Sequence, residues 1–292
     1  MRAFIFPGQG SQFPGMGYDL FKSSKESKNL FHHANKILNF DIAKIMFEGS
    51  KEDLTKTNVT QPAIFIHSIA LSKCTNLSPD MVAGHSLGEF SALVASKTLS
   101  FEDGLKLVSK RAEAMQTACD DIDSTMAAII GLDCKVIEKV CNEHNDIVVP
   151  ANYNSSNQIV ISGKRNGVIE ICKKLSNLGA KKTVLLPVSG AFHSPIMDLA
   201  KASLKQTITE INFNKPICPI YQNVCAEGIK DPEKIKYNLI EQLTKPVKWF
   251  QTIEKMVNDG ATQFFEIGPG NVLTGLNRRI NRSIESTKLI IE

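Results

Sequence analysis

The chain has 292 residues and a mass of 32.2 kDa, enough for two domains of ordinary size or for one large domain that carries an insertion. Its apolar share of 42% and charged share of 22% are those of a folded globular protein and exclude disordered, collagen-like and coiled-coil chains. The net charge of +4 is too small for a protein that binds mainly a duplex phosphate backbone, so we expect no nucleic-acid partner.

Membrane, metal and disulfide signals are weak. No run approaches the roughly 20 apolar residues of a membrane span, and the apolar start of the chain is too short for a signal peptide, so we expect a cytoplasmic protein with no membrane partner. The seven cysteines contain no C-x-x-C pair and indicate free, mostly buried thiols. The pair His32-His33 could suggest a metal ligand set, but without neighbouring thiolates or carboxylates it favours a polar interruption of a helix.

Strands and helices alternate over the first 100 residues, which is typical of an α/β protein. Apolar residues 4–6 and 81–83 predict buried strands, and the spacing over 30–38 predicts a helix. A second helix is expected to start at Pro62, and residues 87–96 predict a third directly after a strand.

The next predicted helix begins with a capping box, because Ser100 and Asp103 have the S-x-x-D spacing ahead of an apolar stripe. On this helix Arg111 lies at the shoulder of the stripe, and Lys110 lies opposite its centre. We therefore expect Arg111 to face inward or across the edge of a cleft and Lys110 to face water.

The middle of the chain predicts a self-contained unit. Its strands are expected at 126–130, 147–154, 158–162 and 182–188, and its helices at 133–144 and 167–178. The order βαββαβ is that of a ferredoxin-like module. We expect residues 125–188 to form this inserted domain, and residues 1–124 and 189–292 to form one discontinuous large domain.

The last part of the chain returns to the α/β pattern. Residues 249–258 and 272–282 predict helices, and 263–267 and 289–291 predict strands.

Gly84-His85-Ser86-Leu87-Gly88 fits the G-x-S-x-G pattern of a nucleophile elbow. The pattern alone is moderate evidence, but it falls between a predicted strand and a predicted helix. A sharp turn there exposes the serine and points the amides of the helix start toward a developing oxyanion. We interpret Ser86 as a nucleophile rather than as part of a structural Gly-Ser turn.

A serine nucleophile needs a base, and His193 is the best candidate, because it lies in a loop at the point where the chain leaves the inserted unit. His85 is expected to point away from Ser86, and His67 to be a core histidine with its hydrogen bonds satisfied. No Asp or Glu between Ser86 and His193 is singled out as the third member of a triad. A dyad whose imidazole is held by a backbone or amide carbonyl therefore stays open.

Several ordered blocks, together with the elbow, resemble one known family from residue 4 to about residue 280. They are Phe6-Pro7-Gly8-Gln9-Gly10-Ser11-Gln12, Gly84-His85-Ser86-Leu87-Gly88-Glu89, Lys110-Arg111-Ala112-Glu113-Ala114-Met115-Gln116, Gly190-Ala191-Phe192-His193-Ser194, Pro246-Val247-Lys248-Trp249 and Glu266-Ile267-Gly268-Pro269-Gly270. The set is similar to the malonyl-CoA:acyl carrier protein transacylases, the bacterial-type acyltransferases of fatty acid synthesis. This resemblance implies an α/β-hydrolase-like large domain around the ferredoxin-like insertion.

The resemblance also implies roles for individual residues. Ser86 matches the family's nucleophile and His193 its base, and Arg111 matches the arginine that binds the malonyl carboxylate. The resemblance assigns the oxyanion hole to the amides of Gln9 and Leu87 and gives the main-chain carbonyl of Gln242 the task of orienting the histidine.

The implied activity is transfer of malonyl from malonyl-CoA to the phosphopantetheine thiol of an acyl carrier protein through a malonyl-serine intermediate. It needs no cofactor and no metal, and we expect a monomer. Two alternatives remain open: a serine esterase or thioesterase that uses water as the acceptor, and a non-catalytic docking module of a larger synthase.

The positive charge of the chain is unevenly distributed. Residues 125–188 hold eight Lys or Arg against five Asp or Glu, which is three of the four net charges, and Arg278, Arg279 and Arg282 form a second basic cluster. These positions are either ordinary solvated faces or a docking surface for an acidic carrier protein.

Overall fold

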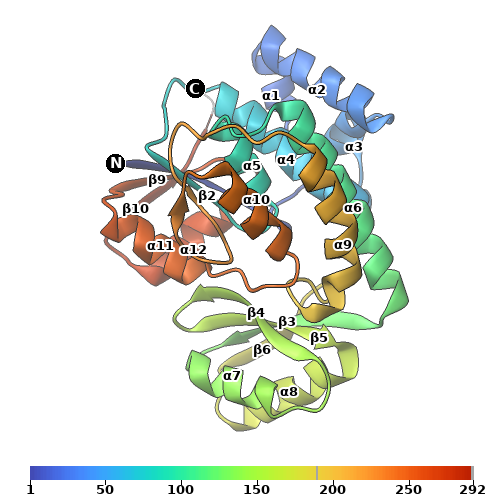
Figure 1. Ribbon diagram of the computed structural model, residues 1–292, viewed down its shortest axis with the longest axis vertical. Coiled ribbons are helices and arrows are strands. Elements are labelled where there is room, and N and C mark those ends of the chain that lie inside the picture. The colour runs from blue at the N-terminus through green and yellow to red at the C-terminus, as the bar shows by residue number, and fades with distance from the viewer. Residues whose placement is uncertain (189, 291–292) are drawn as a thin grey trace.

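A computed structural model describes residues 1–188 and 190–290, and its strands form two separate sheets (Figure 1). Within the described residues, the larger sheet has six strands in the order β10-β9-β1-β2-β7-β8. Its neighbouring strands are parallel, apart from the antiparallel pair β7 and β8. The strands are β1 (Arg2–Phe6), β2 (Met81–Gly84), β7 (Ile220–Tyr221), β8 (Gly228–Ile229), β9 (Gln263–Glu266) and β10 (Glu285–Lys288).

The central strands β1 and β2 are buried on both faces, because their side chains alternate between two apolar cores on opposite sides of the sheet. Phe4 and Phe6 of β1 belong to a large apolar core together with residues of several helices on one face. Ala3 and Ile5 belong to a second core, which includes Trp249. The helices around the sheet are α1 (Tyr18–Ser23), α2 (Lys25–Leu38), α3 (Ile42–Glu48), α4 (Thr57–Lys73), α5 (Gly88–Ala95), α6 (Phe101–Asp121), α9 (Asp198–Glu210), α10 (Pro232–Glu241), α11 (Trp249–Asn258) and α12 (Val272–Ile280), with short 3-10 turns at Asp53–Thr55 and Pro195–Met197.

The smaller sheet lies at the lower end of the molecule in Figure 1 and is antiparallel, in the order β4-β5-β3-β6. It consists of β3 (Ser124–Ile130), β4 (Val148–Ser155), β5 (Gln158–Lys164) and β6 (Lys182–Leu185), with helices α7 (Cys134–Asn142) and α8 (Arg165–Asn177). Chain order and strand order are those of a ferredoxin-like unit. The expected fold class, an α/β protein with this unit inserted, is confirmed. The division at residues 124/125 and 188/189 stays a prediction, and Ser189 itself lies outside the described residues.

Several predicted elements differ in their bounds from the elements of the structure. Helix α4 begins at Thr57, so Pro62 lies in its second turn, where the missing amide removes a single helical hydrogen bond. Strand β6 ends at Leu185 instead of residue 188. The last strand is at 285–288 instead of 289–291, because the polar segment Glu285–Lys288 pairs with β9 through its backbone and needs no apolar run. Residue 291 lies outside the described part of the chain.

The start of α6 is as predicted, since the Ser100 hydroxyl accepts a hydrogen bond from the Asp103 amide. In the part of the chain that the structure describes, no helix is long and apolar enough to cross a membrane. Residues 1–188 and 190–290 contain no group of three or more His, Cys, Asp or Glu arranged to hold a metal ion, and the seven cysteines are free thiols.

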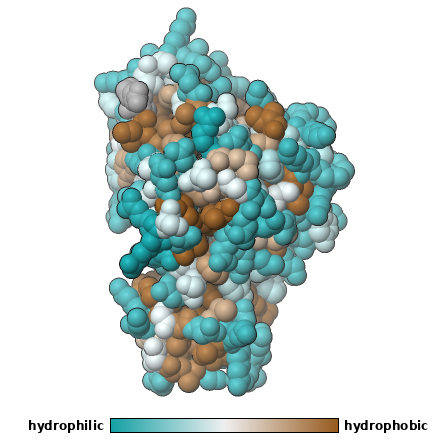
Figure 2. Space-filling model, turned by 90° about the vertical axis from the view of Figure 1, so that its left-hand side faces the viewer, coloured by the Kyte–Doolittle hydropathy of each residue, from teal (hydrophilic) through white to brown (hydrophobic). Residues whose placement is uncertain are grey.

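Figure 2 shows the side of the molecule that faces left in Figure 1. The surface narrows between the part that holds the large sheet and the ferredoxin-like unit below it. Hydrophobic side chains reach the surface in patches above and below this waist, within a mostly hydrophilic surface.

Candidate active site

Ser86 lies in a sharp turn between β2 and α5, with a φ of 52°, in the left-handed region that non-glycine residues rarely adopt. The turn is tight on both sides of the serine. A Cβ on Gly84 would lie 1.9 Å from the Gly88 carbonyl carbon, and a Cβ on Gly88 would lie 2.0 Å from the Phe6 carbonyl oxygen. The glycines of the elbow are therefore required because backbone approaches backbone, and the strain at Ser86 is held by its surroundings.

His193 faces Ser86 from the loop that leads into α9. Its Nε2 lies 2.8 Å from the Ser86 Oγ, and its Nδ1 lies 2.8 Å from the Gln242 carbonyl oxygen and 3.2 Å from that of Lys245. Because carbonyl oxygens only accept hydrogen bonds, Nδ1 carries the proton and Nε2 is free to accept the serine hydroxyl. Backbone carbonyls therefore occupy the place that a carboxylate takes in a triad.

The imidazole of His193 is 3% exposed, and its environment favours the neutral base. Burial and, after it, the nearby Arg111 charge together lower the pKa of His193 to about 3, against the opposing effect of the Gln242 carbonyl. A base of this kind is unprotonated at neutral pH and ready to accept a proton.

Arg111 extends from α6 into the same site and is 1% exposed. Its Nη1 donates to Gln61 Oε1 at 2.7 Å, and its Nη2 donates to Ser86 Oγ at 3.0 Å and to Gln242 Oε1 at 3.3 Å. Among the described residues, its Nε has no acceptor. Burial lowers the pKa of Arg111 to about 10, and the charge of Glu89 opposes this shift, so the side chain stays cationic at neutral pH. A buried guanidinium with an unused N–H is suited to bind a carboxylate.

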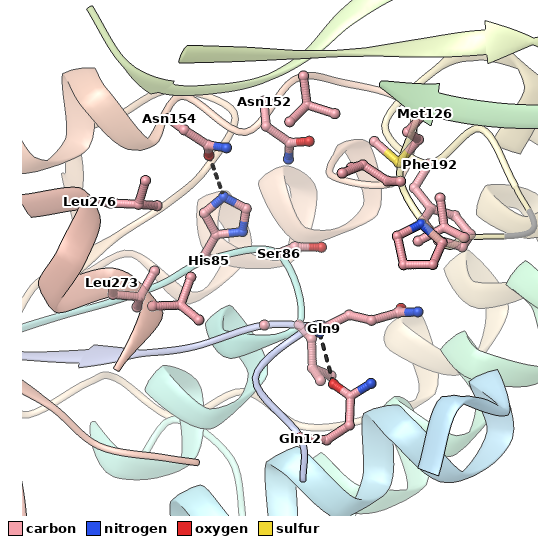
Figure 3. Close-up of a pocket in the computed structure, with 18 of the residues that line it drawn as sticks. Gln9, Gln12, His85, Ser86, Met126, Asn152, Asn154, Phe192, Leu273 and Leu276 are labelled. Atoms are coloured by element: carbon pink, nitrogen blue, oxygen red, sulfur yellow. Dashed lines mark hydrogen bonds between the residues drawn. The ribbon is translucent and has the colours of Figure 1, made fainter. Parts of the chain in front are cut away.

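Ser86, His193 and Arg111 line a cavity of about 780 Å³, part of which is drawn in Figure 3. Gln9 lies across the cavity from Asn152 and Asn154, and His85 points toward Asn154 with its Nε2 2.9 Å from Oδ1. Leu87 also lines the cavity. No acceptor for the amides of Gln9 and Leu87 is found within residues 1–188 and 190–290, so both donors remain for a ligand.

The structure brings all six residues that the sequence singled out to this cavity or into contact with its lining. Lys110, by contrast, lies at the surface and pairs with Glu113. His67 differs from expectation, because it is buried but its Nδ1 has no partner in the described chain. Four further residues contribute hydrogen bonds to the site: Gln61, Glu89, Asn154 and Asn223. Of these, only Glu89 belonged to a sequence motif, as the last residue of the elbow block.

The family model for an acyl transferase domain matches residues 3–290 of this chain. The chain belongs to the acyl transferase family. One curated member of the family, the malonyl CoA-acyl carrier protein transacylase of Staphylococcus aureus strain MW2, is 41% identical over 291 residues, which cover 98% of this chain and 94% of the relative. The enzyme of the same name from Bacillus subtilis strain 168 is 41% identical over 97% of this chain and 92% of its own length.

Solved structures of the acyl transferase family agree with this assignment. The malonyl CoA-acyl carrier protein transacylase of Coxiella burnetii is 38% identical and superposes with a TM-score of 0.96, covering 99% of this chain and 93% of the other. A malonyl-transacylase solved in complex with its type II PKS acyl-carrier protein is 36% identical, with a TM-score of 0.95, and covers 100% of this chain and 96% of the other.

Proposed function

We propose that this acyltransferase transfers malonyl from malonyl-CoA to the phosphopantetheine thiol of an acyl carrier protein and so supplies the extender unit for fatty acid synthesis. The observation that carries the proposal is the convergence on one hydroxyl: the Ser86 Oγ lies within hydrogen-bond distance of both His193 and Arg111. A nucleophile, a neutral base and a buried cation fit a thioester whose acyl group ends in a carboxylate. The names of the relatives point to the same substrate and acceptor.

The first half-reaction forms the malonyl ester. His193 accepts the proton of Ser86 while the oxygen attacks the thioester carbonyl, and Arg111 holds the carboxylate. The amides of Gln9 and Leu87 stabilise the tetrahedral oxyanion, each by about 3 to 4 kcal/mol. The carbon–sulfur bond then breaks, and the imidazolium returns its proton to the leaving CoA thiolate.

The second half-reaction reverses these steps with a new thiol. The phosphopantetheine thiol gives its proton to His193 and attacks the ester carbonyl, and the same two amides hold the second oxyanion. Collapse returns the proton to Ser86 and releases the malonyl thioester on the carrier protein. Neither half-reaction requires a metal or a cofactor.

The remaining parts of the proposal concern the whole chain. We assign the catalytic groups to a discontinuous domain, residues 1–124 and 189–292, and the far wall of the cavity to the inserted unit, residues 125–188. We further propose a cytoplasmic monomer that meets its carrier protein transiently.

Intact-protein mass spectrometry after mixing with malonyl-CoA tests this function. Wild type is expected to gain one malonyl group and to lose it when a holo-carrier protein is added, whereas Ser86→Ala gains none. Free malonate as the product, undiminished by the carrier protein, would instead identify a thioesterase. A wild-type protein that gains no mass and transfers nothing would identify a non-catalytic docking module.

A further inference from the structure

The side chain of Asn223 joins the two ends of the nucleophile elbow. Its Oδ1 accepts a hydrogen bond from the Ser86 amide at 2.7 Å, and its Nδ2 donates to the Gly84 carbonyl at 2.6 Å. Asn223 follows strand β7, which pairs with β2 in register Ala83↔Tyr221. The side-chain amide of Asn223 therefore reaches the elbow from the end of the neighbouring strand. It bonds the backbone of the elbow just beyond the last paired residues of β2 and β7.

The His85 amide still donates to the Phe6 carbonyl of β1, but the Ser86 amide that follows it has the Asn223 side chain as its acceptor. Ser86 holds a left-handed φ of 52°, and no Cβ fits at Gly84 or Gly88. A backbone conformation of this kind persists only where several contacts fix it. One planar amide that donates to residue 84 and accepts from residue 86 sets the separation of the two peptide groups, and it fits in one orientation only.

Asn223 is itself held by Glu89, a buried carboxylic acid on the first turn of α5. Glu89 Oε2 accepts a hydrogen bond from the main-chain N–H of Asn223 at 2.8 Å, and Glu89 Oε1 accepts one from Gln222 Nε2 at 3.0 Å. The Asn223 carbonyl accepts from the Lys248 amide at 3.0 Å. Every polar group of Asn223 is thus engaged, and the side chain has no freedom to turn away from the elbow.

We propose that Asn223, held in place by Glu89, is a positioning residue that fixes the Ser86 backbone for acyl transfer. The inference rests on the proposed malonyl transfer and adds to it a residue that touches neither substrate nor the reacting atoms. Because the Ser86 conformation also directs the Leu87 amide, loss of the bridge misplaces the nucleophile and one oxyanion donor together. The expected effect is on kcat, with little change in the KM for malonyl-CoA.

The isosteric change Asn223→Asp tests the bridge through its pH dependence. A protonated Asp can donate to the Gly84 carbonyl and accept from the Ser86 amide, as Asn does, whereas a carboxylate places an acceptor against the carbonyl oxygen. We expect the kcat of Asn223→Asp, divided by that of wild type, to rise at least tenfold as the pH is lowered from 8.5 to 5.5. Asn223→Ala is expected to lose at least tenfold in kcat at every pH.

The exposed Asn212 provides a matched control, because Asn212→Asp makes the same chemical change away from the site and should leave the kcat ratio flat. A flat ratio for Asn223→Asp, or an Asn223→Ala variant within twofold of wild type, would overturn the proposal. So would an Asn223→Asp protein that melts far below wild type at pH 5.5, since that result makes the residue part of the scaffold. If wild type itself transfers no malonyl, the proposed function fails instead.

Glu89→Gln tests the second half of the inference. Both oxygens of Glu89 accept hydrogen bonds, one from the main-chain N–H of Asn223 and one from Gln222 Nε2. The side-chain NH2 of the introduced glutamine would face one of these two donors, so one hydrogen bond would be lost and Asn223 would be held less firmly. We expect kcat to fall several-fold with the KM for malonyl-CoA within twofold of wild type. An unchanged kcat would remove Glu89 from the proposal.

Discussion

Arg111 donates a hydrogen bond to Ser86, with 3.0 Å between Nη2 and Oγ, on the same hydroxyl that lies 2.8 Å from His193 Nε2. The cation is therefore placed at the nucleophile itself and not at a distant end of the pocket. In a malonyl thioester the carboxylate and the reacting carbonyl are separated by one methylene group, so a carboxylate held by Arg111 brings the carbonyl close to Ser86.

Replacing Arg111 with Ala should separate malonyl from acetyl transfer. Without the guanidinium, the malonyl carboxylate is buried without a partner, so we expect malonyl transfer to fall at least about 100-fold and acetyl transfer far less. Radiolabelled transfer assays with the two acyl-CoA substrates measure both rates. Lys110→Ala is the matched control, since Lys110 is the exposed neighbour and pairs with Glu113. Equal losses for both acyl groups would contradict the assignment.

His193 should stay neutral over the physiological range. Its pKa is lowered to about 3, so on lowering the pH it gains a proton only far below its ordinary value of 6.5. Histidine ¹⁵N chemical shifts should show the Nδ1–H tautomer unchanged from pH 8 to pH 5, with the signal identified by its loss in His193→Gln. A His193 signal that titrates near pH 6.5 would show that burial and the Arg111 charge do not control the base.

Glycine at position 88 should be essential for stability. A methyl group there meets the Phe6 carbonyl oxygen at 2.0 Å, and because both partners are backbone, the elbow must move. We expect Gly88→Ala to lower the free energy of unfolding by about 3 to 5 kcal/mol, as measured by urea denaturation. Gly275→Ala on α12 meets no atom within 4 Å and should raise stability by about 0.5 to 1 kcal/mol. Equal effects of the two changes would refute the close-approach argument.

Charge reversal tests the basic docking surface. Arg279 lines the cavity and donates to Gln158 Oε1 at 2.7 Å, whereas Lys173 and Lys174 lie on α8 of the inserted unit. We expect Arg279→Glu and the pair Lys173→Glu and Lys174→Glu to raise the KM for the carrier protein and to weaken its salt dependence. Acylation by malonyl-CoA alone, measured separately, monitors damage to the first half-reaction.

The control for this experiment is Lys205→Glu, an equal charge reversal at an exposed position on α9. It should leave the KM for the carrier protein unchanged. If charge reversal at Lys173, Lys174 and Arg279 also leaves that KM and its salt dependence unaltered, the basic residues are ordinary solvated faces.

Structural features that depend on interactions between residues close in the sequence could be predicted from the sequence. Apolar periodicity and the Ser100 cap located α6, and the order of strands and helices identified the ferredoxin-like unit. The elbow pattern identified Ser86, because glycines flanking a serine between a strand and a helix have a local steric cause. Two predicted elements had wrong bounds: the polar edge strand β10 forms through backbone pairing with β9 and lies before the predicted strand, and the helix containing Pro62 begins before the proline.

Tertiary structure decided how the candidate catalytic groups are held, and of their partners only the Gln242 carbonyl was expected beforehand, from the family resemblance. The Gln242 carbonyl is 49 positions along the chain from its partner His193. Gln61 is 50 positions from its partner Arg111, and Asn223 is 137 positions from its partner Ser86. Hydrogen bonds of this kind leave no periodicity or spacing in the sequence, since each depends on two segments that the fold brings together. The sequence by itself therefore predicted which residue is the candidate nucleophile and which elements lie on either side of it. The packing of the sheet, the helices and the inserted unit determined which side chains contact Ser86 and how its backbone is oriented.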